Sequence, residues 1–325
     1  MEHFVTGGTG FIGAHLVRRL IDRGDTVHAL VRNPDAVTTL PDTVELVEGD
    51  VTDKESMRDG MAGCDRVFHL AGWYQIGLHD PATAYRVNVD GTRNVLELMQ
   101  DLDVEKGVYT SSLAVFSDTG GDVVTESYRH DGSHLSLYDR TKWEAHYEVA
   151  APMIAQGLPL VIVQPGAVYG PGDRGPTWKL WKPYLQGDLP IIPRQAGYCW
   201  GHVQDTADGH VRAMLEGRVG ESYIIAGEPL RLVDVFAMAE DITGIPTPRS
   251  VSPALFRAMA RIVAPLERIH RFPPEYSSEA LRILGGVTYW GDNTKAVEEL
   301  GLEHRPFRTG LGETLEAELD HLHGS

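Results

Sequence analysis

Tyr138 and Lys142 stand four residues apart within the segment 137–145, whose pattern predicts a helix. On a helix, residues at this spacing project from one face. A phenol with a pKa near ~10 is a poor proton carrier at neutral pH, but an ammonium beside it stabilises the phenolate. The pair therefore predicts a proton-transfer group, although the same spacing also occurs in ordinary pairs on a helix surface.

Two serines, Ser111 and Ser112, follow directly on the strand expected at 107–110. In parallel sheets flanked by helices, ligands collect at the carboxyl ends of the strands. A serine hydroxyl there can bond a carbonyl oxygen and share proton transfer with Tyr138. Spacing alone does not decide between the two serines, and Ser111 could instead cap a turn.

A glycine-rich loop lies between an expected strand at 2–5 and an expected helix at 10–23. Gly7 permits a tight turn, Gly10 lets backbone N–H groups approach a pyrophosphate, and Gly13 allows close contact between helix and strand. The loop therefore predicts a dinucleotide phosphate site, formed by Gly7, Thr9, Gly10, Phe11, Ile12 and Gly13.

The end of the second expected strand, at 26–31, selects between the two nicotinamide dinucleotides. A carboxylate there would hold the ribose 2′-hydroxyl of NAD(H), but this chain has Arg32, where a 2′-phosphate would lie. We therefore expect NADP(H), with NAD(H) as the alternative if Arg32 is an ordinary solvated residue. Residues after later strands are expected to line the adenine and ribose channel, namely Asp50, Val51, Leu70, Ala71 and Gly72.

The elements that must position these residues alternate regularly in the first half of the chain. Short apolar runs and amphipathic stretches follow one another, which is typical of a doubly wound α/β Rossmann fold with a parallel sheet. Strands are expected at 2–5, 26–31, 44–47, 66–70, 107–110 and 160–163, and helices at 10–23, 54–61, 82–100 and 136–156. We assign 1–170 to this domain and expect segments around 201–226 to return to it.

The rhythm changes after about residue 170, where prolines and glycines punctuate shorter elements. This predicts a smaller, mainly helical substrate-binding region over 171–325, with helices at 204–217, 232–242, 253–270, 276–284 and 308–322. The segment 253–270 combines helically spaced apolar residues with a basic set, Arg257, Arg261, Arg268 and Arg271. It predicts a lid, a helix at a membrane surface or an ordinary packed helix, and the pattern does not choose among them.

Composition excludes several classes of protein. The chain has 325 residues, 42% of them hydrophobic, which supplies a core for one large or two ordinary domains. Its net charge of −17 repels nucleic acid. Cys64 and Cys199 match no metal or redox spacing, no metal site is expected, and neither a signal peptide nor a spanning segment is indicated. We expect a cytoplasmic protein that acts on a small molecule. The histidines that form no metal-spaced cluster include His79, His130, His134 and His202.

Taken together, these residues resemble the short-chain dehydrogenases/reductases, and specifically their extended branch of epimerases, dehydratases and reductases. The matching motifs follow the family's order over residues 4–210. They are Thr6-Gly7-x-x-Gly10-x-x-Gly13, Asp50-Val51, His69-Leu70-Ala71-Gly72, Asn88-Val89-x-Gly91-Thr92, Ser111-Ser112, Tyr138-x-x-x-Lys142, Pro165-Gly166-x-Val168-Tyr169-Gly170-Pro171 and His202-Val203-x-Asp205.

The resemblance implies a role for each matching residue. Tyr138 would be the general acid/base, and Lys142 its electrostatic partner and a ribose ligand. Ser112 would polarise the carbonyl; it is preferred because it stands four residues before Phe116, where the branch usually has tyrosine. Asn88 would serve a proton-relay water or, equally well, support a helix. The resemblance also implies a homodimer through the helices near 82–100 and 136–156, and nicotinamide contacts at Thr110, Pro165 and Val168.

Departures from the family pattern narrow the reaction. Ala167 and Tyr198 replace an asparagine and an arginine that contact the diphosphate in nucleotide-sugar epimerases, and Leu113-Ala114 replaces the Asp-Glu pair of sugar dehydratases. Buried phosphates need donors, so these changes argue against a nucleotide sugar. Trp73 and Tyr74 suit an apolar ring-containing substrate or pack under a surface loop.

The sequence is similar to dihydroflavonol-reductase-like and hopanoid-associated epimerase-like members of the family. We therefore expect an NADP(H)-dependent oxidoreductase that acts on a carbonyl or alcohol of a small to medium, partly hydrophobic substrate. A sugar epimerase that retains NAD(H), and a cofactor-binding sensor or scaffold without turnover, stay as alternatives.

Overall fold

The structure is a computed structural model that describes residues 1–325 except 78–79, 176, 268, 271, 274–276 and 325. His79, Arg268, Arg271 and the first residue of the helix expected at 276–284 therefore lie outside the described residues.

The centre of the described part is a seven-stranded sheet, ordered β10-β6-β5-β4-β1-β2-β3, in which all neighbours run parallel. The expected doubly wound sheet is confirmed, with β10 as an additional edge strand. Every residue of β6 is buried, as is typical of a strand covered by helices on both faces. The strands are β1 (Glu2–Thr6), β2 (Thr26–Val31), β3 (Glu45–Glu48), β4 (Arg66–His69), β5 (Lys106–Thr110), β6 (Leu160–Gln164) and β10 (Ser222–Ile224).

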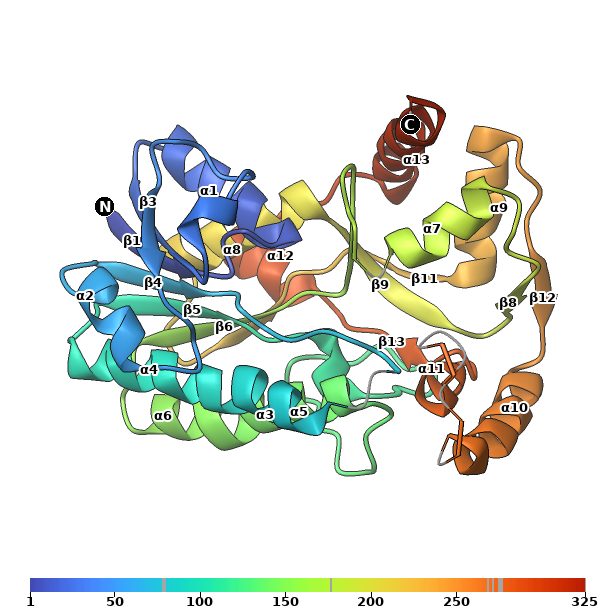
Figure 1. Cartoon of the computed structure of the whole chain (residues 1–325), viewed down its shortest axis with the longest axis horizontal. Helices are drawn as coiled ribbons and strands as arrows, with labels where there is room; N and C mark the ends of the chain where they lie inside the picture. The colour runs from blue at the N-terminus through green and yellow to red at the C-terminus, as the bar shows by residue number, and fades with distance from the viewer. Residues whose placement is uncertain (78–79, 176, 268, 271, 274–276, 325) are drawn as a thin grey trace.

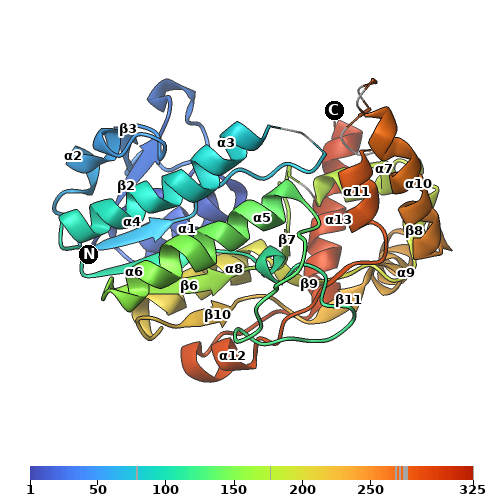
Figure 2. The ribbon, with the colours of Figure 1, turned by 90° about the horizontal axis from the view of Figure 1, so that it is seen from below.

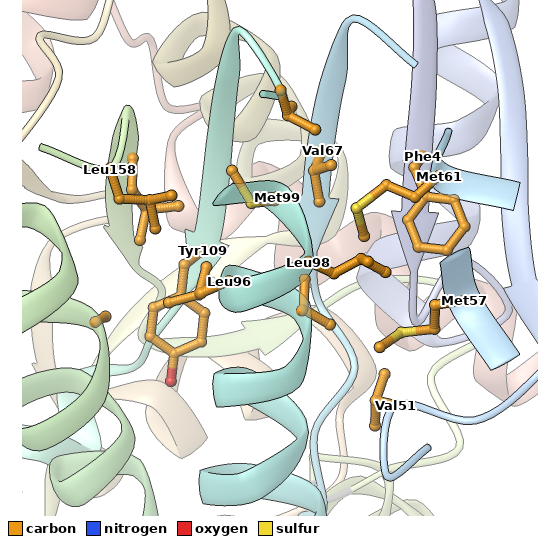
Figure 3. Packing of buried hydrophobic residues seen from close by; sticks show 14 of the residues in the cluster. Phe4, Val51, Met57, Met61, Val67, Leu96, Leu98, Met99, Tyr109 and Leu158 are labelled. Atoms are coloured by element: carbon orange, nitrogen blue, oxygen red, sulfur yellow. The ribbon is translucent and has the colours of Figure 1, made fainter. Parts of the chain in front are cut away.

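Helices cover both faces of the sheet (Figure 1). On one face lie α1 (Phe11–Asp22), α8 (Val203–Leu215) and α12 (Thr294–Leu300), whose apolar residues join one buried cluster. On the other face, residues of α2 (Arg58–Met61) and α4 (Gly91–Asp101) pack on the sheet in a second cluster (Figure 3). The stripe Val95, Leu96, Leu98 and Met99 is fully buried there, so core burial fixes the rotation of α4.

Two long helices lie side by side on this second face (Figure 2). The first runs through α3 (Pro81–Tyr85), a π-helical segment at Arg86–Asp90 and α4. The second runs through α5 (Leu137–Glu144), a π-helical segment at Ala145–Ala150 and α6 (Ala151–Ala155). Single π-helical segments of this kind are frequent at functional sites.

Apart from α8, β10 and α12, which belong to the main sheet and its cover, the described chain after residue 170 forms a second cluster of elements beyond the carboxyl edge of that sheet (Figure 1). As expected, much of it is helical, but it also holds short strands of two to six residues that are too brief to produce a clear alternating pattern. Strand β9 (Gly197–His202) pairs with β7 (Ala167–Tyr169), β11 (Pro229–Arg231) and β13 (Thr288–Tyr289), and β8 (Ile191–Pro193) pairs with β12 (Arg249–Val251). The helices are α7 (Trp178–Leu185), α9 (Leu232–Thr243), α10 (Pro253–Leu266), α11 (Ser278–Ile283) and α13 (Phe307–Gly324).

Helix α10, singled out from its sequence, packs through Phe256 and Ala260 against Leu281 of α11. Its outer face exposes Leu255 and Ile262. Packing against α11 thus explains the inner face of α10. A role of the helix as a lid or as a membrane contact stays a prediction. Among the described helices, none combines the length and apolar character needed to cross a membrane.

Candidate active site

The glycine loop joins β1 to α1 in a backbone that only small residues permit. Gly7 has a φ of 73°, and a Cβ there would stand 2.6 Å from the nitrogen of Ala71. A Cβ on Gly13 would collide with the carbonyl oxygen of Gly7. Helix α1 begins at the N-cap Gly10 without a capping side chain. Its first N–H groups and positive dipole end thus fit the pyrophosphate of a dinucleotide.

Arg32 follows β2 directly and is exposed. Among the described residues it forms no ion pair, so its guanidinium is free to meet an anion. Asp50, after β3, is half-buried, and its Oδ1 accepts a hydrogen bond from the nitrogen of Thr52 at 2.8 Å. Val51 is buried in the core. Strand β2 is therefore followed by an exposed cation, Arg32, and strand β3 by a turn that Asp50 orders through its hydrogen bond.

Tyr138 lies in the first turn of α5, whose start is set by Ser136, because the Ser136 hydroxyl accepts a hydrogen bond from the nitrogen of Asp139 at 3.0 Å. The Ser112 hydroxyl accepts a hydrogen bond from the nitrogen of Ala114 at 3.1 Å and lies beside the Tyr138 phenol. Burial raises the pKa of Tyr138 to about 12, and the nearby Ser112 hydroxyl opposes that shift. Ser111 instead points to buried His146, with 2.8 Å between Oγ and Nδ1. The structure thus brings Ser112, rather than Ser111, beside Tyr138.

Lys142 lies one turn further along α5 and is 5% exposed. Its Nζ donates hydrogen bonds to the carbonyl oxygen of Thr110 at 2.7 Å and to the Tyr109 hydroxyl at 3.2 Å. Burial lowers the pKa of Lys142 to about 7. In the part of the chain that the structure describes, no hydrogen bond joins Lys142 to Tyr138. The sequence placed both residues on one helix, but it did not reveal that the ammonium is held by the end of β5.

A buried polar network that the sequence analysis missed extends from Lys142 into the sheet. The rings of His69 and Tyr109 stack with centroids 5.5 Å apart. His69 bonds Thr92 through Nε2 at 3.0 Å and Thr6 through Nδ1 at 2.8 Å. Burial lowers the pKa of His69 to about 3, so its ring is neutral at pH 7. Polar residues near the ends of otherwise apolar strands were the signal that could have indicated this network.

Asn88 lies in the π-helical segment before α4 and is 1% exposed. Its Nδ2 donates to the Thr141 hydroxyl at 2.9 Å and to the carbonyl oxygen of Trp73 at 3.0 Å. Its Oδ1 accepts from the nitrogen of Trp73 at 2.6 Å. These contacts join the segment after β4 to α5. Asn88 therefore has a structural, supporting role. Its service to a relay water stays a prediction.

Aromatic rings line the side of Tyr138 that faces the C-terminal elements. Tyr74 meets Tyr138 edge to face, with centroids 4.5 Å apart, and is 45% exposed. Tyr198, on β9, stacks on Tyr289 of β13 at 5.9 Å. Trp73 is half-buried. Of the two aromatic residues expected near the substrate, Tyr74 thus lies beside the catalytic candidate, Trp73 is bonded through its backbone to Asn88, and Tyr198 and Tyr289 extend the aromatic surface.

Asp139, next to Tyr138, is a buried carboxyl group that sequence reasoning did not single out. Its Oδ1 accepts from the Ser136 hydroxyl at 2.6 Å and its Oδ2 from the Tyr289 hydroxyl at 3.0 Å. Burial raises the pKa of Asp139 to about 7, and the charge of Glu279 adds to the shift. Ser136 is a local partner, but Tyr289 and Glu279 lie far along the chain, so no local pattern could have indicated them.

The remaining cofactor candidates gather at the same sheet edge. Leu70 and Ala71 follow β4, and the nitrogen of Ala71 donates to the Thr6 hydroxyl at 3.2 Å. Thr110 ends β5 and its hydroxyl bonds Nε2 of His210 at 2.9 Å. Gly72 is exposed, Pro165 is buried after β6, and half-buried Val168 lies in β7. The glycine loop, Ser112, Lys142 and these residues thus share the carboxyl edge where doubly wound sheets bind ligands.

Comparisons with known proteins agree with this arrangement. A family model described as the NAD dependent epimerase/dehydratase family matches residues 3–226. The chain is 34% identical over 328 residues to a Synechocystis sp. protein provisionally named a dihydroflavonol 4-reductase, covering 96% of this chain and 93% of the relative. It is 30% identical over 317 residues to the sterol demethylase protein B of Methylococcus capsulatus, covering 93% of each.

Among solved structures, the crystal structure of gox2253 superposes with a TM-score of 0.86 at 30% identity, covering 99% of this chain and 98% of that one. The match extends through the C-terminal elements, so both parts of the fold are shared. By sequence, fold and site geometry, the chain belongs to the NAD-dependent epimerase/dehydratase family.

Proposed function

We propose that the protein is an NADP(H)-dependent oxidoreductase that reduces a carbonyl, or oxidises the corresponding alcohol, of a small to medium, partly hydrophobic substrate. The observation that carries this proposal is the position of the Ser112 hydroxyl beside the Tyr138 phenol, at the sheet edge that also holds the glycine loop. An acid and a polarising hydroxyl beside a dinucleotide site are the parts that carbonyl reduction requires.

Each residue has a distinct part in the reaction. When bound, the nicotinamide supplies or accepts the hydride. Ser112 donates a hydrogen bond to the substrate oxygen, and Tyr138 gives that oxygen its proton. Lys142 binds the ribose and stabilises the phenolate that Tyr138 leaves behind, which opposes the increase in phenol pKa caused by burial.

Cofactor choice follows from the end of β2. Arg32 is exposed and free to bond a 2′-phosphate, and a guanidinium matches phosphate in geometry and charge. NADP(H) is therefore the proposed cofactor, with its pyrophosphate on the first N–H groups of α1.

The substrate side supports an apolar ring-containing molecule. Tyr74, Tyr198 and Tyr289 present aromatic surface near Tyr138, and Ala167 has no polar group for a diphosphate. The names of the Synechocystis and Methylococcus relatives refer to a dihydroflavonol and to sterols, both ring compounds. We further propose that residues 171–325 contribute most of this binding region, and that the protein is a cytoplasmic homodimer.

Nicotinamide absorbance tests the proposal directly. NADPH oxidation is followed with acetophenone, progesterone and dihydroquercetin for the wild type, Tyr138→Phe and Lys142→Met. We expect turnover by the wild type and a loss of roughly 10²–10⁴-fold in kcat for Tyr138→Phe, the usual contribution of a positioned proton donor. Activity that survives both substitutions would refute the mechanism.

The second candidate is a sugar epimerase that oxidises and re-reduces its substrate while retaining NAD(H). The match to the epimerase/dehydratase family model supports it, because the same serine, tyrosine and lysine serve both reactions. Mass spectrometry of the purified protein separates the candidates. Tightly held NAD(H), with no net consumption of added cofactor and with conversion of UDP-glucose, indicates the epimerase, and dinucleotide binding without any turnover indicates a sensor or scaffold.

A further inference from the structure

We propose that Glu279, on α11, is a positioning residue that fixes Tyr138 relative to Tyr74 by bonding the backbones of both their segments. The proposal rests on the proposed function, since it concerns how that site recognises its substrate. Glu279 comes from the C-terminal part of the chain and is 3% exposed. It lies in none of the motifs that identify the family.

The two carboxylate oxygens of Glu279 have separate partners. Oε1 accepts a hydrogen bond from the nitrogen of Leu137 at 2.7 Å. Oε2 accepts one from the nitrogen of Gly77, also at 2.7 Å. Hydrogen bonds to a buried ionised group are short and strong, and each lost one leaves a polar group unpaired. One side chain thus links two segments that are remote from it in sequence.

The bond to Leu137 completes the start of the catalytic helix. The first N–H groups of a helix have no partner within it. Ser136 satisfies the nitrogen of Asp139, and Glu279 satisfies that of Leu137. A carboxylate here is also favoured by the positive end of the helix dipole. Because Tyr138 follows Leu137 directly, anchoring this nitrogen fixes the turn that carries the phenol.

The bond to Gly77 holds the segment that carries the aromatic side of the site. Asn88 bonds the backbone of Trp73 at one end of this segment, and Glu279 bonds Gly77 at the other. Between these two points lies Tyr74, whose ring meets that of Tyr138. Glu279 thus fixes the backbone near both rings of this contact: one carboxylate oxygen holds the segment of Tyr138 and the other holds the segment of Tyr74.

Helix α11 is itself held in place by α10. The Glu267 carboxylate accepts hydrogen bonds from the nitrogen of Ser278 at 2.7 Å and from its hydroxyl at 2.6 Å. The C-terminal elements are therefore linked to the catalytic helix by two glutamate side chains in series: Glu267 accepts from the backbone of α11, and Glu279 of α11 accepts from the backbone of α5. The glycine loop and Arg32 take no part in this link, so its loss should affect substrate recognition while dinucleotide affinity is retained.

The central variant is Glu279→Gln, which keeps the size of the side chain but can accept at only one of the two positions. We expect KM for the best of the probes progesterone, dihydroquercetin and acetophenone to rise about tenfold, the effect of one lost charge-assisted bond, with a smaller change in kcat. The dissociation constant of NADPH should stay within about twofold of the wild-type value. An unchanged KM, or an equal loss of NADPH affinity, would overturn the proposal.

A variant of the backbone at Leu137 tests separately the hydrogen bond between Glu279 and the start of α5. Leu137→Pro removes the N–H group that donates a hydrogen bond to Glu279. Residue 137 is the first helical position, where proline is well tolerated. Ser136 has φ −137° and ψ 164°, which suits a residue before proline. Leu137→Ala is the matched control, because it shortens the side chain and keeps the N–H. Leu137→Pro should reproduce the KM effect of Glu279→Gln, and equal KM values for the two Leu137 variants would contradict the proposed link.

Hydrogen exchange gives a readout that needs no turnover. In Glu279→Gln, amide exchange should speed up in peptides that cover 72–77 and 136–142 as well as in α11. Faster exchange confined to α11 would show that Glu279 serves only its own helix and would reject the proposal. If the wild type reduces none of the probes, the proposed function fails, and the exchange experiment still decides the role of Glu279.

Discussion

The ammonium nitrogen of Lys142 lies 2.7 Å from the carbonyl oxygen of Thr110 and donates a hydrogen bond to it. This bond places a buried cation at the end of β5, directly under the edge where a dinucleotide would lie. Burial lowers the pKa of Lys142 to about 7. The residue that we propose stabilises the phenolate as a cation is therefore only partly protonated near neutral pH.

Binding of NADPH should consequently take up a proton through Lys142. The phosphates bring negative charge near the ammonium, which raises its pKa, so at pH 8 the mostly neutral amine becomes protonated on binding. At pH 6 the amine already carries its proton and the uptake should vanish. Calorimetry in buffers of different ionisation enthalpy measures this uptake. Lys142→Met should show none at pH 8, and wild-type uptake that persists in this variant would assign the proton to another group.

The two neighbouring serines should separate function from stability. Ser112→Ala removes the hydroxyl beside Tyr138, so kcat should fall by roughly 10²-fold or more. The variant also loses the bond from the nitrogen of Ala114, but this position is half-buried, so stability should fall less than for a buried group left unpaired. Ser111→Ala leaves buried His146 without its partner and should lower the free energy of unfolding by about 1–3 kcal/mol. Urea unfolding and steady-state kinetics on both variants check the assignment. The opposite pattern would exchange the roles of the serines.

Much of this site was visible in the sequence because its parts are local patterns. The glycine loop, the tyrosine and lysine one turn apart, and the serines after a strand each reflect the backbone next to them. The first six strands and their membership of a doubly wound parallel sheet were predicted from the alternation of apolar runs and amphipathic helices, whereas their order in the sheet comes from the structure. The preference for Ser112 agrees with its contact to Tyr138.

The parts that were missed depend on contacts between distant segments. Asp139 meets Tyr289 across 150 residues, and Glu279 meets Leu137 across 142. The short strands around β9 are stabilised by their partners and by buried tryptophans such as Trp200, so their own sequences carry little signal. Asn88 was weighed as a catalytic or a supporting residue, and only its three bonds to Trp73 and Thr141 favour support.

Asp139 should make stability depend on pH. Its folded pKa of about 7 exceeds the ordinary value of 3.8, so the folded state holds a proton that the unfolded state releases between these values. Stability from this group is therefore present below pH 4 and is lost as pH rises to 7, by at most ~1.4 kcal/mol per pH unit. The difference in unfolding free energy, Asp139→Asn minus wild type, should grow across this window and level off above pH 7.

Urea titrations at intervals between pH 4 and pH 8 measure this difference. Asp59→Asn is the matched control, because Asp59 is exposed on α2 and makes the same chemical change without burial. Its curve should run parallel to that of the wild type. A parallel curve for Asp139→Asn as well would show that the buried carboxyl does not titrate in this range.

Arg32 should decide the choice of dinucleotide. Arg32→Asp removes the partner of the 2′-phosphate and adds a carboxylate that can bond the ribose hydroxyls of NADH. The preference for NADPH over NADH should therefore weaken by about 1–3 kcal/mol, or roughly 5- to 150-fold in the ratio of dissociation constants. Arg93→Asp is the control, since Arg93 is exposed on α4 and the variant has the same net charge. Dissociation constants for both dinucleotides, measured by fluorescence, test the difference. An equal fall in NADPH affinity for the two variants would mean that net charge, and not Arg32 at the end of β2, selects the cofactor.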